Sequence, residues 1–117
     1  MKIFCFALFL LTISAYGGEP ELTPSQIDMG QVKNQATATF MLHNKTEAPI
    51  VITRANSDCS CTKVKFTERP IMAGDSTKVV IKYNPAKDEV GTFYKTVFVY
   101  TSHSDRSVNA VIRGKNY

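Results

Sequence analysis

Two cysteines that stand one residue apart, Cys59 and Cys61, are the side chains best suited to chemistry in this sequence. In a regular strand, residues i and i+2 lie about 6.6 Å apart at Cα, whereas a disulfide prefers about 4.4–6.8 Å and a specific torsion. A bridge across extended backbone would therefore be strained, and it becomes reasonable only if Ser60 bulges. A strained bridge is easily reduced, which would suit redox chemistry.

Metal binding and a purely structural role are the other interpretations. Structural zinc takes four ligands, and the chain has only two histidines, His43 and His103. In the topology argued below, the histidines lie at one end of the molecule and the cysteines at the other, which argues against zinc; two thiolates could instead hold copper(I). In a structural role, one cysteine is buried and the other fills the bend, as thiols or a local bridge. We expect this role, without cofactor or metal, and keep redox and copper as alternatives.

The N-terminus has the layout of a secretory signal. Lys2 precedes an apolar run over 3–13, and small residues follow at Ala15 and Gly17. This run is shorter than the roughly 17–25 residues that a membrane-crossing helix needs. We predict a signal peptide over residues 1–17, cleaved after Gly17 or alternatively after Ala15, and export to the periplasm or out of the cell.

The remaining residues, 18–117, suffice for one domain with one core. Cleavage removes Cys5, and no cysteine follows the apolar run where a lipid anchor would need one. The formal net charge of the whole chain is +4, but basic residues alternate with acids and form no run that would track phosphates. We predict no nucleic-acid partner and no transmembrane segment after cleavage. Weak attraction to an anionic membrane or cell-wall polymer stays open.

Beyond the signal, hydrophobicity alternates with period two between short turns, which is typical of β-strands. The alternating segments are 25–30, 36–44, 48–56, 62–66, 76–85, 91–102 and 106–114. Their inward faces are predicted to hold Ala38, Phe40, Leu42, Ile50, Ile52, Ala55, Val79, Ile81, Tyr83, Phe93, Val97, Val99, Val108, Ala110 and Ile112. About seven strands in about 100 residues indicate an all-β, antiparallel, immunoglobulin-like sandwich, with a small barrel as the alternative. The chain has no Trp, so the antibody Cys…Trp…Cys pattern is absent and apolar packing must join the sheets.

The segments IDMGQV, FMLHNKTEAPIVITRANSDCSCT, PIMAGDSTKVVIKYNP, GTFYKTVFVYTS and NAVIRG have the order and spacing of one family. The chain resembles the bacterial exported family known as domain of unknown function fifteen seventy-three. That family is similar to the immunoglobulin-like group that includes the major sperm protein and cilia-associated sandwich domains. The family reads Cys-Gly-Cys-Thr where this chain has Cys59-Ser60-Cys61-Thr62, which weakens any claim that the bend requires a left-handed residue. The resemblance implies the fold and export, and it implies no reaction.

Two further motifs have the residue types of functional sites, but we expect both to be turns. Ser102, His103, Ser104 and Asp105 have the residue types of a catalytic triad, but neighbours in one hairpin turn cannot take the positions of nucleophile, base and orienter. We expect a polar turn there. Asn44-Lys45-Thr46 fits an N-glycosylation pattern, which we interpret as an ordinary turn. We predict that the chain is not an enzyme.

Aromatic residues give the most distinctive predicted surface. Tyr94, Phe98 and Tyr100 fall on the strand face opposite the core, and Val80 and Val111 could widen the patch. Exposed apolar clusters often mark contact surfaces, although side-chain stems from neighbouring strands could cover them. An open sheet edge is a second route to a partner.

These observations support two hypotheses. The first is an exported, non-enzymatic, immunoglobulin-like module that binds a protein or an envelope component through its aromatic face or an open edge. The second is a small thiol-dependent factor, either a copper(I) carrier or a redox partner, in which Cys59 and Cys61 do the work.

Overall fold

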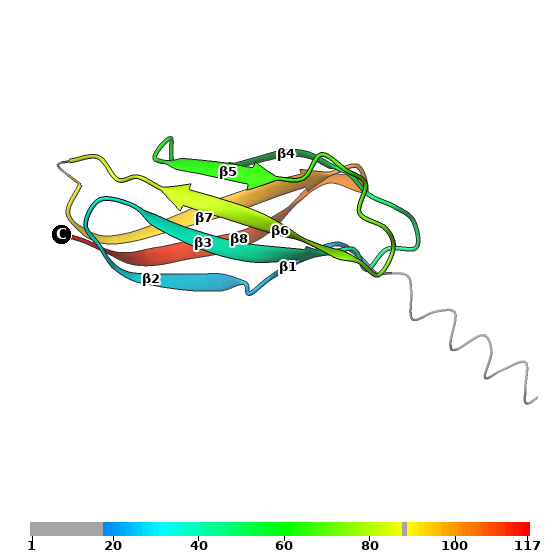
Figure 1. Cartoon of the computed structure of the whole chain (residues 1–117), viewed down its shortest axis with the longest axis horizontal. Coiled ribbons are helices and arrows are strands. Elements are labelled where there is room, and N and C mark those ends of the chain that lie inside the picture. Colours follow the sequence, from blue (N-terminus) through cyan, green and yellow to red (C-terminus); the bar gives the residue numbers. More distant parts are fainter. Residues whose placement is uncertain (1–17, 88) are drawn as a thin grey trace, which may run out of the picture.

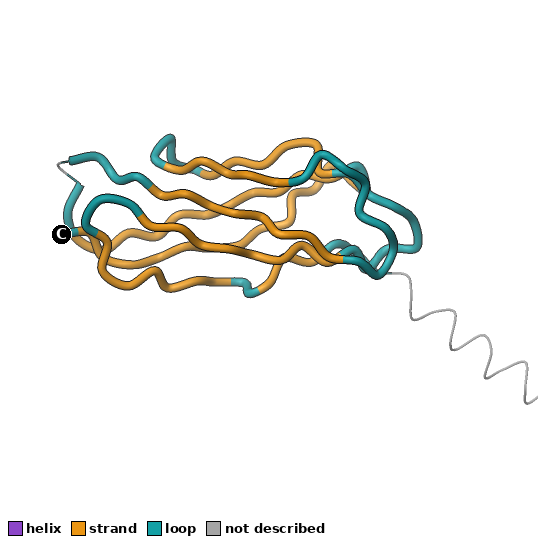
Figure 2. Tube along the Cα trace, viewed as in Figure 1, coloured by secondary structure: helices purple, strands orange, loops and turns teal. Residues whose placement is uncertain are grey.

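The computed structural model describes residues 18–87 and 89–117, so the predicted signal peptide, residues 1–17, lies outside the described part of the chain. The described part holds eight strands and no helix (Figures 1 and 2). It therefore contains no helix long and apolar enough to cross a membrane. The strands are β1 (Glu21–Thr23), β2 (Gln26–Val32), β3 (Ala36–His43), β4 (Ile52–Ser57), β5 (Thr62–Phe66), β6 (Ser76–Tyr83), β7 (Gly91–Thr101) and β8 (Ser104–Asn116).

The strands form two four-stranded sheets, which confirms the predicted sandwich. Sheet 1 has the order β1-β3-β6-β5, and sheet 2 has the order β2-β8-β7-β4. Figure 1 shows β5, β6 and β3 in one layer, with β4, β7 and β8 in the layer behind. Neighbouring strands are antiparallel with one exception, because β2 and β8 run parallel.

The parallel pair arises where the prediction had a single N-terminal strand over 25–30. The chain pairs first with β3 as β1, crosses between the sheets at Pro24, and continues in sheet 2 as β2. There it lies along the open side of β8, in the direction that β8 already takes. The strictly antiparallel arrangement is therefore wrong at this edge and right elsewhere.

The core between the sheets follows the predicted alternation closely. Every residue predicted to face inward is buried, apart from Ala55 and Val108, which are half-buried and still pack on the core. A register shift between Ile52 and Arg54 changes the phase of β4, so Ala55 faces inward instead of Arg54. The core also includes Leu22, Val32 and Ile71, which the alternation did not identify.

A buried polar loop closes one end of the sandwich. The Asn44 side chain donates from Nδ2 to the carbonyls of Ala48 and Ile71, at 2.9 and 2.7 Å. Its Oδ1 accepts from the backbone N–H of Thr46 at 2.9 Å and from the Thr46 hydroxyl at 2.6 Å. Both amide hydrogens of Asn44 are thus used inside the protein, and only 1% of the residue is exposed. The Asn44-Lys45-Thr46 motif is a turn, as predicted, and a glycan has no room on Asn44 in the folded chain.

Close packing between sheet 2 and the core requires a glycine at position 114 of β8. A Cβ added to Gly114 would lie 2.7 Å from the carbonyl oxygen of Gly30 and 2.8 Å from two carbons of the Phe93 ring. Both distances are too short for a real Cβ, and the Gly30 oxygen belongs to the backbone and cannot swing aside. The Phe93 ring therefore occupies the space that a side chain at 114 would need.

We predict that Gly114→Ala lowers the free energy of unfolding by about 1–3 kcal/mol, the usual cost of overpacking a close-packed site. Chemical denaturation followed by circular dichroism measures this change. Lys115→Ala at the exposed neighbouring residue is the control, and it should cost less than about 0.5 kcal/mol. Equal stability of Gly114→Ala and the parent chain would contradict the packing of Phe93 against β8.

Candidate functional site

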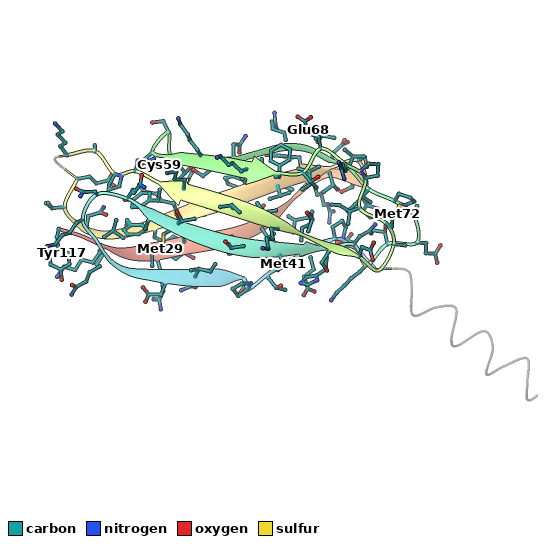
Figure 3. The ribbon with its side chains drawn as sticks, viewed as in Figure 1. Met29, Met41, Cys59, Glu68, Met72 and Tyr117 are labelled. Atoms are coloured by element: carbon teal, nitrogen blue, oxygen red, sulfur yellow. A yellow bond between two sulfur atoms is a disulfide. The ribbon has the colours of Figure 1, made fainter. Side chains whose placement is uncertain are left out.

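Cys59 and Cys61 are joined by a disulfide in the turn between β4 and β5. Their Cα atoms are 5.1 Å apart, which is closer than the about 6.6 Å of extended backbone, because the chain turns at Ser60. The condition that the sequence set for a bridge, a bend at Ser60, is therefore met. Both cysteines are half-buried. Figure 3 shows Cys59 in the half of the molecule that holds Tyr117, away from Met72.

Hydrogen bonds tie this turn to both sheets. The Asn84 N–H donates to the Cys61 carbonyl at 2.7 Å, next to the end of β6 in sheet 1. The Asp58 N–H donates to the carbonyl of Thr96 in sheet 2 at 3.2 Å, and Asp58 Oδ1 accepts from the Thr96 N–H at 3.1 Å. Within the turn, the Cys61 N–H donates to Cys59 Sγ at 3.1 Å. The disulfide thus closes a turn that fastens the two sheets to each other.

The two histidines lie at the opposite end of the sandwich from the cysteines. His43 pairs in register with Ser76, where β6 begins, whereas the cysteine turn contacts Asn84, just past the end of β6. His103 follows the end of β7 and lines a shallow hollow with residues 46–50. The predicted separation of histidines and cysteines is confirmed. Within residues 18–87 and 89–117, no three His, Cys, Asp or Glu side chains gather in a way that could hold a metal ion.

His43 is a cross-strand link, which the sequence did not reveal. Its Nε2 lies 2.6 Å from Thr23 Oγ1 on β1, and its Nδ1 lies 2.6 Å from Ser76 Oγ on β6. Nearby, Lys45 Nζ lies 2.9 Å from Glu21 Oε2. The hydrogen bond from Lys45 and the positive charge of Lys45 lower the pKa of Glu21. Since both ring nitrogens of His43 contact hydroxyls, the ring joins β1 to β6 across β3.

The turn predicted over Ser102–Asp105 is formed by Ser102 and His103, and β8 begins at Ser104. The Ser102 hydroxyl accepts from the Val51 N–H at 2.9 Å, and the Ser104 hydroxyl accepts from the Arg106 N–H at 3.2 Å. Residues 102–105 are all exposed. The two hydroxyls therefore accept hydrogen bonds from backbone amides, as expected of polar side chains in and beside a turn.

The predicted aromatic surface lies on the outer face of sheet 2. Tyr94 is 62% exposed, whereas Phe98 and Tyr100 are half-buried. The guanidinium carbon of Arg54 lies 4.2 Å from the centre of the Tyr100 ring, so a neighbouring side chain covers part of this surface. We call Tyr94, Phe98 and Tyr100, together with Arg54, the aromatic face.

Two residues expected to widen the aromatic face fall on different sheets. Val111 of β8 pairs with Thr96 of β7, so it shares the outer face of sheet 2. Val80 belongs to β6 and pairs with Thr39 of β3. The expectation for Val80 is wrong, because alternation identifies the outward side of a strand and does not say which sheet the strand joins.

A shallow hollow borders the exposed ring of Tyr94. Arg113 of β8 pairs in register with Tyr94 on one side and with Asp28 of β2 on the other. Arg113 Nη2 lies 3.6 Å from Asp28 Oδ2, and the hollow also reaches Phe93 beside Gly114. Aromatic, cationic and anionic groups therefore meet at this end of the face.

A buried polar cluster lies near the C-terminal end of β8. The Tyr83 hydroxyl donates to Glu89 Oε2 at 2.6 Å and accepts from Asn116 Nδ2 at 2.8 Å. Asn116 Nδ2 also donates to Glu89 Oε2 at 3.1 Å. Burial, together with the hydrogen bond to Glu89, raises the pKa of Tyr83 to about 12. The sequence predicted that Tyr83 faces inward, but it carried no signal for partners that come from the loop after β6 and from β8.

This cluster predicts a specific pH dependence of stability. From about pH 10, the usual tyrosine pKa, up to about 12, the unfolded chain loses the Tyr83 proton and the folded chain keeps it, so the free energy of unfolding falls as pH rises. Tyr83→Phe should remove this part of the fall, and it should cost about 1–3 kcal/mol at neutral pH because Glu89 and Asn116 lose a partner. Denaturant titrations at about pH 9 and about pH 11 measure both effects. Tyr117→Phe, at an exposed tyrosine, is the control. If the free energy of unfolding of Tyr83→Phe fell between these two pH values by as much as that of the parent chain, the pH dependence would not come from Tyr83.

Comparison with known proteins identifies a family over nearly all of the described chain. Residues 21–116 match the model of a family described as Protein of unknown function (DUF1573). A search of curated proteins finds no match.

Solved structures share the fold at low sequence identity. A protein of unknown function from Porphyromonas gingivalis W83 is 17% identical, with a TM-score of 0.71 over 86% of this chain and 48% of its own length. This chain thus spans about half of that protein. The PapD-like domain 7 of human CEP192 is 10% identical, with a TM-score of 0.63 over 85% of each chain. WR4, a C. elegans MSP family member, is 9% identical, with a TM-score of 0.54 over 86% of this chain and 99% of its own. These similarities confirm the immunoglobulin-like sandwich fold, which the chain shares with the PapD-like domain and the MSP family member.

Proposed function

The chain belongs to the family described as Protein of unknown function (DUF1573), and from that premise we propose that it is an exported, non-enzymatic module that binds a protein or an envelope component. The observation that carries this proposal is the exposure of Tyr94. This residue is 62% exposed, although it belongs to β7, an interior strand of sheet 2. A large aromatic ring in such a position gains apolar contact when a partner covers it.

The surroundings of Tyr94 support a protein contact. Aromatic residues and arginine are enriched at protein interfaces, and Arg113 borders the Tyr94 ring while Arg54 stacks on Tyr100. Phe98 lies between these two positions, paired with Asn56 and Asn109 on the neighbouring strands. The aromatic face therefore offers apolar rings for burial and polar groups that fix the orientation of a partner.

We predict that Tyr94→Ala reduces capture of the partner from an envelope fraction by about tenfold, the effect of losing an interface anchor worth about 1–2 kcal/mol. Tyr100→Ala should also reduce it, because the Arg54 stack is lost. Binding to the immobilised chain is quantified for each variant. Met72→Ala, at a residue that is 54% exposed and lies at the opposite end of the molecule from Tyr117, is the matched control. Capture by Tyr94→Ala equal to that of the parent and of the control would reject the aromatic face as the contact.

A second candidate function rests on the disulfide itself. Reduction with a small thiol would deliver two electrons and two protons and give free thiols at Cys59 and Cys61. As thiolates these could hold one copper(I) ion, and the intact disulfide could instead exchange with a partner dithiol. The half-buried position of both cysteines in a short turn favours this candidate over any other site for chemistry on the described chain.

Thiol titration with and without copper(I) separates the two functions. For a binding module, we predict that replacing both cysteines by serine lowers stability and leaves partner capture unchanged, because the residues of the aromatic face are on β7 and β4 and none of them belongs to the cysteine turn. A thiol-dependent factor would take up about one copper(I) per reduced chain, or exchange its disulfide with a small thiol, and the double serine variant would do neither. Stoichiometric copper uptake or exchange, lost in that variant, would overturn the prediction.

A further inference from the structure

The open edge of sheet 1 carries a lysine-rich surface that no run in the sequence indicated. β5 is the last strand of this sheet and pairs only with β6. Lys63 and Lys65 of β5, with Lys78 and Lys82 of β6, alternate with inward-facing apolar residues and are all exposed. The register sets Lys63 directly opposite Lys82. We call these four residues the lysine face.

No acid on the neighbouring strands balances the lysine face. The positions of β3 that pair with Lys78, Val80 and Lys82 are Met41, Thr39 and Thr37, which are uncharged. The ion pairs among residues 18–87 and 89–117 are Glu21–Lys45 and Asp28–Arg113, and neither includes these four lysines. Like charges directly opposite each other in a sheet are destabilising, so an anionic partner would relieve a repulsion that the fold leaves in place.

The backbone of β5 is also open along this edge. The Asn84 N–H bonds to the Cys61 carbonyl, so Cys61 and Asn84 form a hydrogen-bonded pair of the antiparallel ladder. Such pairs alternate, and by the register of β5 and β6 the next ones are Lys63 with Lys82 and Lys65 with Val80. The N–H and C=O groups of Val64 and Phe66 therefore point away from β6. The backbone hydrogen bonds outside the strand ladders of the described chain include neither residue.

We propose that the open edge of β5 binds an extended peptide segment in which acidic and apolar residues alternate, added to sheet 1 as a further strand. Main-chain hydrogen bonds to Val64 and Phe66 hold such a strand in register. Its acidic side chains, on the outer side, meet Lys63 and Lys65. Its apolar side chains, on the inner side, cover the half-buried side chains of Val64 and Phe66.

The same lysines argue against a second copy of this chain as the occupant. Pairing two β5 edges would bring Lys63 and Lys65 of one copy beside the same lysines of the other, and lysine on an edge strand is a common device against self-association. The lysine face therefore disfavours its own copy and favours an acidic strand. This inference rests on the proposal that the chain is a binding module. It places a contact on sheet 1, whereas the aromatic face lies on sheet 2.

The probe is a synthetic, fluorescently labelled peptide of alternating glutamate and valine, with binding to the purified chain measured by anisotropy. A peptide of the same composition, with its glutamates in one block and its valines in another, should bind at least about tenfold more weakly, because it cannot present acids and apolar residues on opposite sides of a strand. Methylation of the alternating peptide at backbone nitrogens should abolish binding. Equal affinity for the alternating and block peptides would reduce the lysine face to a general site for polyanions and overturn the proposal.

Two variants of the chain test the geometry. Val64→Pro removes an N–H that points away from β6, so the hydrogen bonds between β5 and β6 are kept. Edge strands tolerate proline at such a position. Lys63→Glu combined with Lys65→Glu reverses the charge. We expect each of these variants to lower the affinity for the alternating peptide by at least about tenfold. The control is Lys33→Glu with Lys115→Glu, which gives the same net charge as the double charge reversal and should leave the affinity unchanged. Unchanged binding by either edge variant overturns the edge proposal, and partner capture by Tyr94→Ala reports separately on the aromatic face.

Discussion

Burial of one face of each sheet against the other is the constraint on which the whole structure depends. Within the described residues the only disulfide lies inside a single turn, so the sheets are held together by side chains that alternate inward along the strands. Each fully buried Val, Leu, Ile or Phe contributes about 1.5–3 kcal/mol. Because a slip of one residue would turn every inward side chain outward, the register is fixed, and the outward residues are fixed with it. The aromatic face and the lysine face are consequences of the same register.

Local alternation explains which parts of this arrangement could be predicted. Phe40, Ile81 and Val97 lie in strands with clear period two, and their burial followed from the sequence alone. The reach of a disulfide made a bend at Ser60 the condition for a bridge between Cys59 and Cys61, and the structure has both the bend and the bridge. In contrast, β1 has three residues, too few for a period, so the crossing at Pro24 and the parallel pairing of β2 were not predicted.

Non-local pairing accounts for the remaining differences. Lys63 and Lys82 are neighbours only because β5 pairs with β6 in one register, and in the sequence they lie far apart, each between two uncharged residues. Tyr83, Glu89 and Asn116 meet only because β8 returns past the end of β6. Val80 was assigned to the wrong surface for the same reason. A sequence pattern gives the side of a strand, whereas a surface needs the order of the strands.

We propose that partners contact the aromatic face of sheet 2 or the open edge of sheet 1, and not the cysteine turn. Amide hydrogen exchange of the chain, free and with its captured partner bound, measures this directly because protection is resolved along each strand. We expect slower exchange in β7 and β8 around Tyr94, at the amides of Val64 and Phe66 that point away from β6, or at both. Slower exchange confined to residues 58–61, between β4 and β5, with β5 and β7 unchanged, would contradict this proposal and indicate that the partner contacts Cys59 and Cys61 instead.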